Sequence, residues 1–223
     1  MIIGIFDSGS GGRTVEAEVK KLLPDAKIIY LADTSNLPYG EKTPAELCSI
    51  CERNVKSLIA QGAEIIIVAC NTATTVAINY LRKKFPKTPI VGTEPAIKKA
   101  CEESSASARI LLLATEATTH SPRTLELIRL YRRPTQKVIL QSCPGLADAI
   151  ETNNQLKISE LLSTLTQAKK HELIAPETVI LGCTHYPLIS PQLQAVFPTS
   201  RLVDGSLGVA QETARLANQL RIS

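Results

Sequence analysis

Short apolar segments alternate along the chain with longer segments in which apolar residues recur at helical spacing. The short segments are rich in β-branched residues and predict strands, whereas the longer ones predict amphipathic helices. Because the strands read as apolar on both faces and each precedes a helix, they favour a parallel sheet covered by helices. The expected strands cover residues 2–6, 27–32, 64–69, 89–92, 109–114, 137–141, 177–181 and 201–203.

The helix with the clearest boundaries is predicted over residues 43–61. Thr43 and Glu46 have the spacing of a capping box, and Pro44 stands at the first helical position. Gly62 follows at the expected stop. A final helix is expected over residues 206–220.

Two features indicate two similar α/β domains, each with a mostly parallel sheet flanked by helices. A polar gap at residues 102–107 precedes a new strand, and the surroundings of Cys70 recur around Cys183. We place the boundary near residues 93–98. The first domain then covers residues 1–95, completed by the C-terminal helix 206–223, and the second covers residues 96–205.

Composition removes several classes of function. The chain has 223 residues, of which 44% are hydrophobic, enough for a real core. Aromatic residues make up 4% and Trp is absent, which argues against a stacking platform for nucleic-acid bases. No apolar stretch approaches a membrane span, and the N-terminus lacks the charged start of a signal peptide. We therefore expect a cytoplasmic protein without nucleic-acid or membrane partners, and the net charge of +4 suits a small anionic substrate.

Two of the six cysteines stand out by their setting. Cys70 follows Glu-Ile-Ile-Ile-Val-Ala, and Cys183 follows Glu-Thr-Val-Ile-Leu-Gly. Each is followed by small polar residues and an expected helix start, whose N-terminus lowers a thiol pKa. A buried Cys is usually a small hydrophobe, but two in one setting predict paired acid and base chemistry on a small molecule. Cys48-x-x-Cys51 lies within a predicted helix without a partner motif, so we interpret it as structural and predict no metal site.

Other polar clusters follow predicted strands, where parallel sheets bind ligands. Asp7 begins a Gly-rich segment that reads either as an anion-binding loop or as a tight turn. Tyr39 lies in a segment that reads as a turn or as a lid presenting backbone amides and the Tyr39 hydroxyl. His185 reads as a cap, a core residue or a proton carrier. Glu151 reads, by spacing alone, as a solvated residue at a helix end.

Five motifs, in order, resemble those of glutamate racemase, in the cofactor-independent racemase family that includes aspartate racemase. They are Phe6-Asp7-Ser8-Gly9-x-Gly11-Gly12, Pro38-Tyr39-Gly40-x-Lys42, Ala69-Cys70-Asn71-Thr72-Ala73, Glu94-Pro95 and Leu181-Gly182-Cys183-Thr184-His185-Tyr186-Pro187-Leu188.

The resemblance implies two similar domains with the active site in the cleft between them. It implies racemisation of glutamate without a cofactor, supplying D-glutamate for peptidoglycan synthesis, and it leaves room for a homodimer. Cys70 and Cys183 would be the acid/base pair, assisted by Asp7, His185 and Glu151. The residues that would hold substrate are Asp7, Ser8, Pro38, Tyr39, Gly40, Asn71, Thr72, Thr184 and His185.

Several positions depart from the family pattern: Arg13 after the glycines, Thr124 where Tyr is common, a small run from Gly145 to Ala147, and an early C-terminus. Three alternatives also stay open. The substrate could be aspartate or another amino acid, a single Cys could act as a nucleophile, or the chain could be a catalytically weak amino-acid-binding relative.

Overall fold

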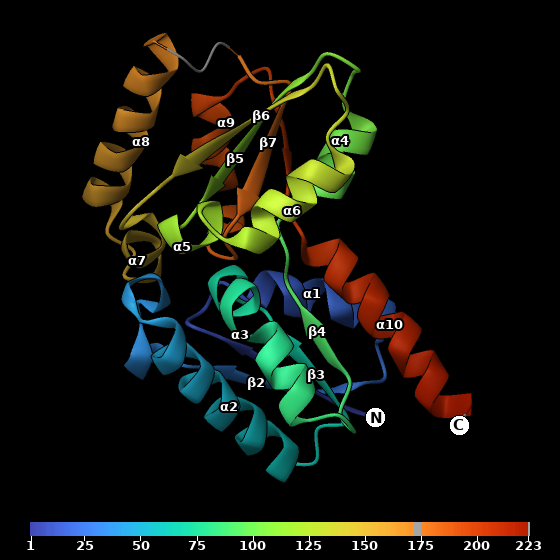
Figure 1. Cartoon of the computed structure of the whole chain (residues 1–223). Helices are drawn as coiled ribbons and strands as arrows, with labels where there is room; N and C mark the ends of the chain where they lie inside the picture. Colours follow the sequence, from blue (N-terminus) through green and yellow to red (C-terminus); the bar gives the residue numbers. More distant parts are fainter. Residues whose placement is uncertain (172–174, 223) are drawn as a thin grey trace. The chain divides into compact units, whose positions relative to one another are not determined.

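The computed structural model describes residues 1–171 and 175–222, and the chain divides into two compact units. Met1–Glu94 and Gly205–Ser223 form the first unit, and Pro95–Asp204 form the second. Each unit contains a four-stranded parallel sheet flanked by helices (Figure 1). The predicted fold class of two similar α/β units is confirmed.

The first unit begins with the chain and ends with its last helix. Its elements are β1 (Ile2–Asp7), α1 (Arg13–Leu22), β2 (Lys27–Ala32), the 3₁₀ helices η1 (Thr34–Asn36) and η2 (Tyr39–Glu41), α2 (Pro44–Ala60), β3 (Ile65–Val68), α3 (Asn71–Lys84), β4 (Ile90–Gly92) and α10 (Ser206–Ile222).

The second unit repeats the alternation of strand and helix. Its elements are α4 (Ile97–Glu103), β5 (Arg109–Ala114), α5 (Glu116–Thr119), α6 (Pro122–Tyr131), β6 (Lys137–Ser142), α7 (Leu146–Glu151), α8 (Gln155–His171), β7 (Thr178–Gly182), the 3₁₀ helix η3 (Tyr186–Ile189), α9 (Ser190–Val196) and β8 (Arg201–Val203). All eight predicted strands are present, and each observed end lies within one residue of its prediction.

The two sheets share one strand order. The order is β2-β1-β3-β4 in the first unit and β6-β5-β7-β8 in the second, with parallel pairing throughout. The third strand in each order therefore occupies the same place: β3 leads into Cys70 and β7 leads into Cys183.

Alternation along the strands divides the first unit into two cores. Ile3 and Ile5 pack with α1 and α10, while Phe6 packs on the opposite face with α2 and α3. The second unit is built likewise, with β5 and β7 side chains facing α7, α8 and α9 on one side and α4 and α6 on the other. Burial on both faces explains why these strands read as continuous apolar runs.

Helix α2 starts and stops where the sequence indicates. The Thr43 hydroxyl accepts from the Glu46 backbone N–H, and the Glu46 carboxylate accepts from the Thr43 N–H at 2.8 Å. Gly62, just beyond the helix, has a φ of 89°. This left-handed conformation suits glycine because a Cβ would crowd the backbone there.

Gly62→Ala should lower the free energy of unfolding by about 1 kcal/mol, the usual cost of a left-handed non-glycine residue. The new Cβ has room, since its nearest neighbour is the Ile2 Cδ1 atom at 3.5 Å, so the penalty is backbone strain. Gly208→Ala is the matched control. Gly208 lies in α10 with open space around it, so Ala there should raise the same free energy by about 0.5 kcal/mol. Urea unfolding of both variants measures this, and an unchanged Gly62→Ala would contradict the strain argument.

Candidate active site

In the first unit, β1 and β3 are neighbouring strands, so the loops that follow them start next to each other. The chain passes from β1 to an edge strand and then returns to β3 on the other side of β1, so the loops after β1 and β3 leave the sheet in opposite directions. Such a reversal opens a crevice at the carboxyl ends of the strands, where ligands bind in open α/β sheets. Asp7 ends β1 and Cys70 follows β3 at this edge.

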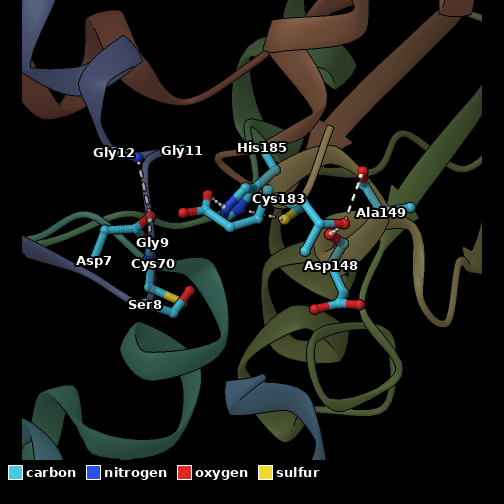
Figure 2. A network of polar contacts seen from close by, with 12 residues as sticks. Asp7, Ser8, Gly9, Gly11, Gly12, Cys70, Asp148, Ala149, Cys183 and His185 are labelled. Carbon is cyan, nitrogen blue, oxygen red and sulfur yellow. Dashed lines mark hydrogen bonds and ion pairs between the residues drawn. The ribbon is translucent and has the colours of Figure 1, made fainter. Parts of the chain in front are cut away.

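The loop after β1 is folded around a fully buried carboxylate. The Asp7 Oδ2 atom accepts from the backbone N–H groups of Gly9 at 3.3 Å and Gly12 at 3.0 Å (Figure 2). A Cβ at Gly12 would lie 2.8 Å from the Ala69 Cβ and 2.9 Å from the Asp7 Cβ. Glycine is therefore required here for close packing, and the loop holds the acidic group of Asp7 in one position.

Cys70 lies between this loop and a helix start. It is the N-cap residue of α3, is 6% exposed, and its Sγ atom lies 3.8 Å from the Ser8 Oγ atom (Figure 2). Asp7, Ser8 and Cys70 form what we call the first thiol group. The structure thus brings together the acid, hydroxyl and thiol predicted for this unit.

The expected direction of the Cys70 pKa was wrong for the protein without substrate. Burial, with a further contribution from the nearby Asp7 carboxylate, raises the pKa of Cys70 to about 12. The N–H groups of Ala73 and Thr72 at the start of α3 act in the opposite direction, as predicted, but burial outweighs them. The resting group is a thiol rather than a thiolate.

Asn71 and Thr72 are buried in the first turn of α3. The Asn71 Nδ2 atom donates to the Thr93 carbonyl at 3.0 Å, which leaves its amide oxygen facing away from that carbonyl. Because β4 ends just before Thr93, this bond ties the residue after Cys70 to the neighbouring strand end.

The Pro38-Tyr39-Gly40 turn is anchored rather than loose. Tyr39 is 3% exposed, and its hydroxyl donates to the Asp33 Oδ2 atom at 2.7 Å. Asn54 in α2 donates to the same Asp33 oxygen at 3.1 Å and to the Tyr39 hydroxyl at 3.1 Å. Burial would raise the Asp33 pKa, but the hydrogen bonds from Tyr39 and its other donors outweigh it and leave the pKa below its usual value.

Asp33 and Asn54 are residues that our sequence analysis missed, although signals for both exist. Asp33 follows strand β2 just as Asp7 ends β1. Asn54 interrupts the apolar stripe of α2 between Ile50 and Leu58. A polar residue on a buried helix face needs a hydrogen-bond partner, and that requirement points to a network.

The second unit holds Cys183 at the end of the strand that corresponds to β3. Its Sγ atom lies 3.8 Å from the His185 Nδ1 atom, and the His185 Nε2 atom lies 2.9 Å from the Glu151 Oε2 atom. His185 is 2% exposed. Figure 2 shows the Cys183 sulfur and the His185 ring directed toward one another. Cys183, His185 and Glu151 form the second thiol group.

The predicted helix start after Cys183 is less regular than the one after Cys70. Thr184 and His185 lie in a turn, Pro187 lies in the first turn of the short 3₁₀ helix η3, and α9 begins only at Ser190. The second thiol therefore lacks the long helix N-terminus found beside Cys70. Its neighbouring titratable partner is His185 instead.

Glu151 does not behave as the solvated helix-end residue that spacing alone suggests. It ends α7, its side chain is 16% exposed, and it pairs with His185 across 34 positions of sequence. Gly145, with a φ of 74°, starts the turn into α7, so the small run at Gly145 to Ala147 sets the entry of this helix.

Two departures from the family pattern have local structural roles. The Arg13 guanidinium lies 3.9 Å from the Tyr30 ring centroid, and the Tyr30 hydroxyl donates to the Gly9 carbonyl at 2.8 Å. Arg13 thereby packs on a residue that supports the Asp7 loop. Thr124 is fully buried and its backbone N–H donates to the Ser121 hydroxyl at 3.0 Å, which caps α6.

Within the described residues, no group of three or more His, Cys, Asp or Glu is arranged to hold a metal ion. Cys48 and Cys51 lie in α2, and all six cysteines are free thiols. Among the helices in the described ranges, none combines the length and apolar character needed to cross a bilayer.

Comparison with known proteins identifies one family. The sequence profile of Asp/Glu/hydantoin racemases matches residues 12–213. The chain is 39% identical to a glutamate racemase from Pseudomonas syringae pv. tomato over 97% of this chain and 78% of that protein.

Solved structures agree with this match. Escherichia coli glutamate racemase in complex with L-glutamate and the activator UDP-MurNAc-Ala superposes with a TM-score of 0.85 at 35% identity, covering 96% of this chain and 81% of that one. Glutamate racemase from Francisella tularensis subsp. tularensis in complex with D-glutamate gives a TM-score of 0.81 at 26% identity, covering 98% and 81%. The resemblance indicated by the five motifs is confirmed.

Asp7→Asn should lower the pKa of Cys70, because the Asp7 carboxylate disfavours a nearby thiolate. A lower pKa gives a larger thiolate fraction at any pH below it, so iodoacetamide should modify Cys70 faster in the variant at mildly alkaline pH. Peptide mass spectrometry measures the rate. Cys51 is fully buried in the same core. Its rate of modification is the control, because it would also rise if the substitution loosened the core. Equal or slower modification of Cys70 would contradict the electrostatic account.

Proposed function

The chain belongs to the Asp/Glu/hydantoin racemase family, and we propose that it interconverts L- and D-glutamate by a two-base mechanism without a cofactor. The observation that carries the proposal is the pair of thiols at corresponding strand ends in two sheets of one strand order. Each thiol has its own acid/base partner nearby, Asp7 in one unit and His185 with Glu151 in the other.

In the proposed reaction, one thiolate removes the proton from the substrate Cα and the other thiol donates a proton to the opposite face. After one turnover, the first cysteine has gained a proton from Cα and the second has given one to Cα. The two cysteines exchange roles for the other enantiomer. The Cα–H of an amino acid is a weak acid. The site must therefore stabilise the carbanion with hydrogen-bond donors aimed at the carboxylate, where negative charge develops.

Each thiol has a different route to the thiolate. Burial and Asp7 keep Cys70 protonated in the protein without substrate. The ammonium group of a bound amino acid would lower the pKa of Cys70, because a nearby positive charge favours the thiolate. Asp7 would balance that ammonium group. For Cys183, the His185 Nδ1 atom would accept the thiol proton, and Glu151 would stabilise the resulting imidazolium through the Nε2 atom.

The remaining polar residues would bind the substrate. Support comes from the burial of seven of them and from the glutamate complexes of the E. coli and F. tularensis enzymes. The buried ones are Asp7, Ser8, Tyr39, Asn71, Thr72, Thr184 and His185. In a bacterium, the D-glutamate formed would supply peptidoglycan synthesis. The proposed ligands of the amino and carboxylate groups are Asp7, Ser8, Pro38, Tyr39, Gly40, Asn71, Thr72, Thr184 and His185.

Cys70→Ala and Cys183→Ala should each abolish racemisation, because either change removes one of the two required proton carriers. The assay incubates each variant with L- or D-glutamate in heavy water. Circular dichroism follows the conversion of one enantiomer into the other, and mass spectrometry follows deuterium incorporation at Cα. Cys101→Ala is the control, since this thiol is buried in α4 and belongs to neither thiol group. Substantial racemisation by either active-site variant would exclude the two-thiol mechanism.

Purified protein should racemise glutamate faster than aspartate or other amino acids when it is assayed on a panel of L-enantiomers. A preference for aspartate would keep the mechanism and change the substrate. Thermal stabilisation by glutamate without racemisation would instead indicate a binding protein. A stable covalent adduct on one Cys would favour nucleophilic chemistry.

A further inference from the structure

We propose that Asn54 is a positioning residue that fixes the Pro38-Tyr39-Gly40 turn through a buried network with Asp33 and Tyr39. Asn54 lies in none of the motifs that indicate the family, and it reaches the turn from the middle of α2. The consequence for substrate affinity rests on the proposed function, whereas the structural effect does not.

The network is closed and buried. Asn54, Asp33 and Tyr39 are 9%, 7% and 3% exposed, respectively. The three side chains form a triangle, in which Asn54 donates at 3.1 Å to both other residues and Tyr39 donates to Asp33 at 2.7 Å. Hydrogen bonds to an ionised carboxylate are stronger than neutral ones, particularly where water is excluded.

Asp33 connects the triangle to both ends of the loop and to the first thiol group. Its second oxygen, Oδ1, accepts from the Asn36 side chain at 2.7 Å and from the Ser35 hydroxyl at 3.1 Å. Its backbone N–H donates to the Asp7 carbonyl at 2.9 Å. The turn at Tyr39, the loop start at Ser35 and the end of β1 are thus all held by one residue.

The network also determines which hydrogen-bond donors of the turn are available to a ligand. The Tyr39 hydroxyl has one proton and donates it to Asp33, so it has none left to donate to a substrate carboxylate. Burial, followed by the Asp33 hydrogen bond, raises the Tyr39 pKa and keeps this hydroxyl protonated. Tyr39 therefore anchors the turn with its side chain, and in the proposed function the turn would bind the substrate carboxylate through its backbone N–H groups.

Helix α2 provides a rigid origin for this anchor. The capping box at Thr43 and Glu46 fixes its start, and the side chains of Leu47, Val55 and Leu58 are buried in the core beside Asn54. An amide among apolar neighbours costs free energy unless it is hydrogen-bonded. Asn54 satisfies that requirement with the two groups that hold the turn.

The test compares Asn54→Ala and Tyr39→Phe with wild-type protein by hydrogen exchange of the peptide covering residues 34–42. Both variants should exchange faster in this segment, because each removes part of the triangle. Tyr39→Phe keeps the ring, so it tests the network even if Asn54→Ala folds poorly. Thr213→Val is the matched control. It removes a buried hydroxyl of α10 that donates to the Val209 carbonyl at 2.7 Å, far from the turn in sequence.

Kinetics provide the second readout. Asn54→Ala should raise the KM for glutamate about 10-fold and leave kcat within about threefold, as expected for loss of one charge-assisted hydrogen bond that acts on binding. Thr213→Val should change neither constant. The double variant of Asn54 and Tyr39 should resemble the single ones, since both belong to one network.

Unchanged exchange of residues 34–42 in folded Asn54→Ala and Tyr39→Phe would overturn the proposal. An equal increase in Thr213→Val would do the same, because it would show general loosening. If wild-type protein does not racemise glutamate, the proposed function fails while the exchange comparison still decides the role of Asn54.

Discussion

The pairing of β1 with β3, and of β5 with β7, is the constraint on which both thiol groups depend. Phe6 lies opposite Val68, and the Ala69 N–H donates to the Phe6 carbonyl at 2.8 Å, so Asp7 and Cys70 must emerge together. In the second sheet Ala114 lies opposite Gly182, directly before Cys183. A Cβ at Gly182 would lie 2.7 Å from the Leu112 Cδ1 atom and 3.0 Å from the Leu113 carbonyl oxygen, so glycine permits this close approach. Sheet register therefore sets which side chains lie together at both strand ends.

Both units also place buried or partly buried carboxylates near the thiols and provide each with directed donors. Asp7 uses backbone N–H groups, Asp33 uses side-chain donors, and Glu151 uses an imidazole. These choices differ in consequence, because backbone donors cannot rearrange without refolding the loop, whereas a histidine can gain or lose a proton. The carboxylate of the first thiol group is thus held by fixed backbone donors, whereas the second thiol group places a histidine side chain between a thiol and a carboxylate.

The strands and the boundaries of α2 were predictable because they depend on local pattern: apolar runs, a capping box and a terminal glycine. The two cysteines were predictable for the same reason, since each directly follows its strand. The Glu151–His185 pair joins residues 34 positions apart and requires knowledge of how α7 packs. The Asn54 network joins α2 to the loop after β2 across 21 positions, so spacing could not reveal it. The sign of the Cys70 pKa shift depends on how burial competes with the α3 N–H groups, and no sequence pattern measures that balance.

The burial of Cys70 has a consequence for the resting protein in an oxidising environment. Peroxide attacks thiolates, and oxidation beyond the sulfenic acid is largely irreversible. A proton carrier that stayed ionised between turnovers would be exposed to that damage throughout the life of the protein. With its pKa raised to about 12, Cys70 keeps its proton at neutral pH, and we expect it to react slowly with peroxide. In the mechanism we propose, the thiolate would form only when substrate is bound, so the sulfur would be vulnerable only while the substrate covers it.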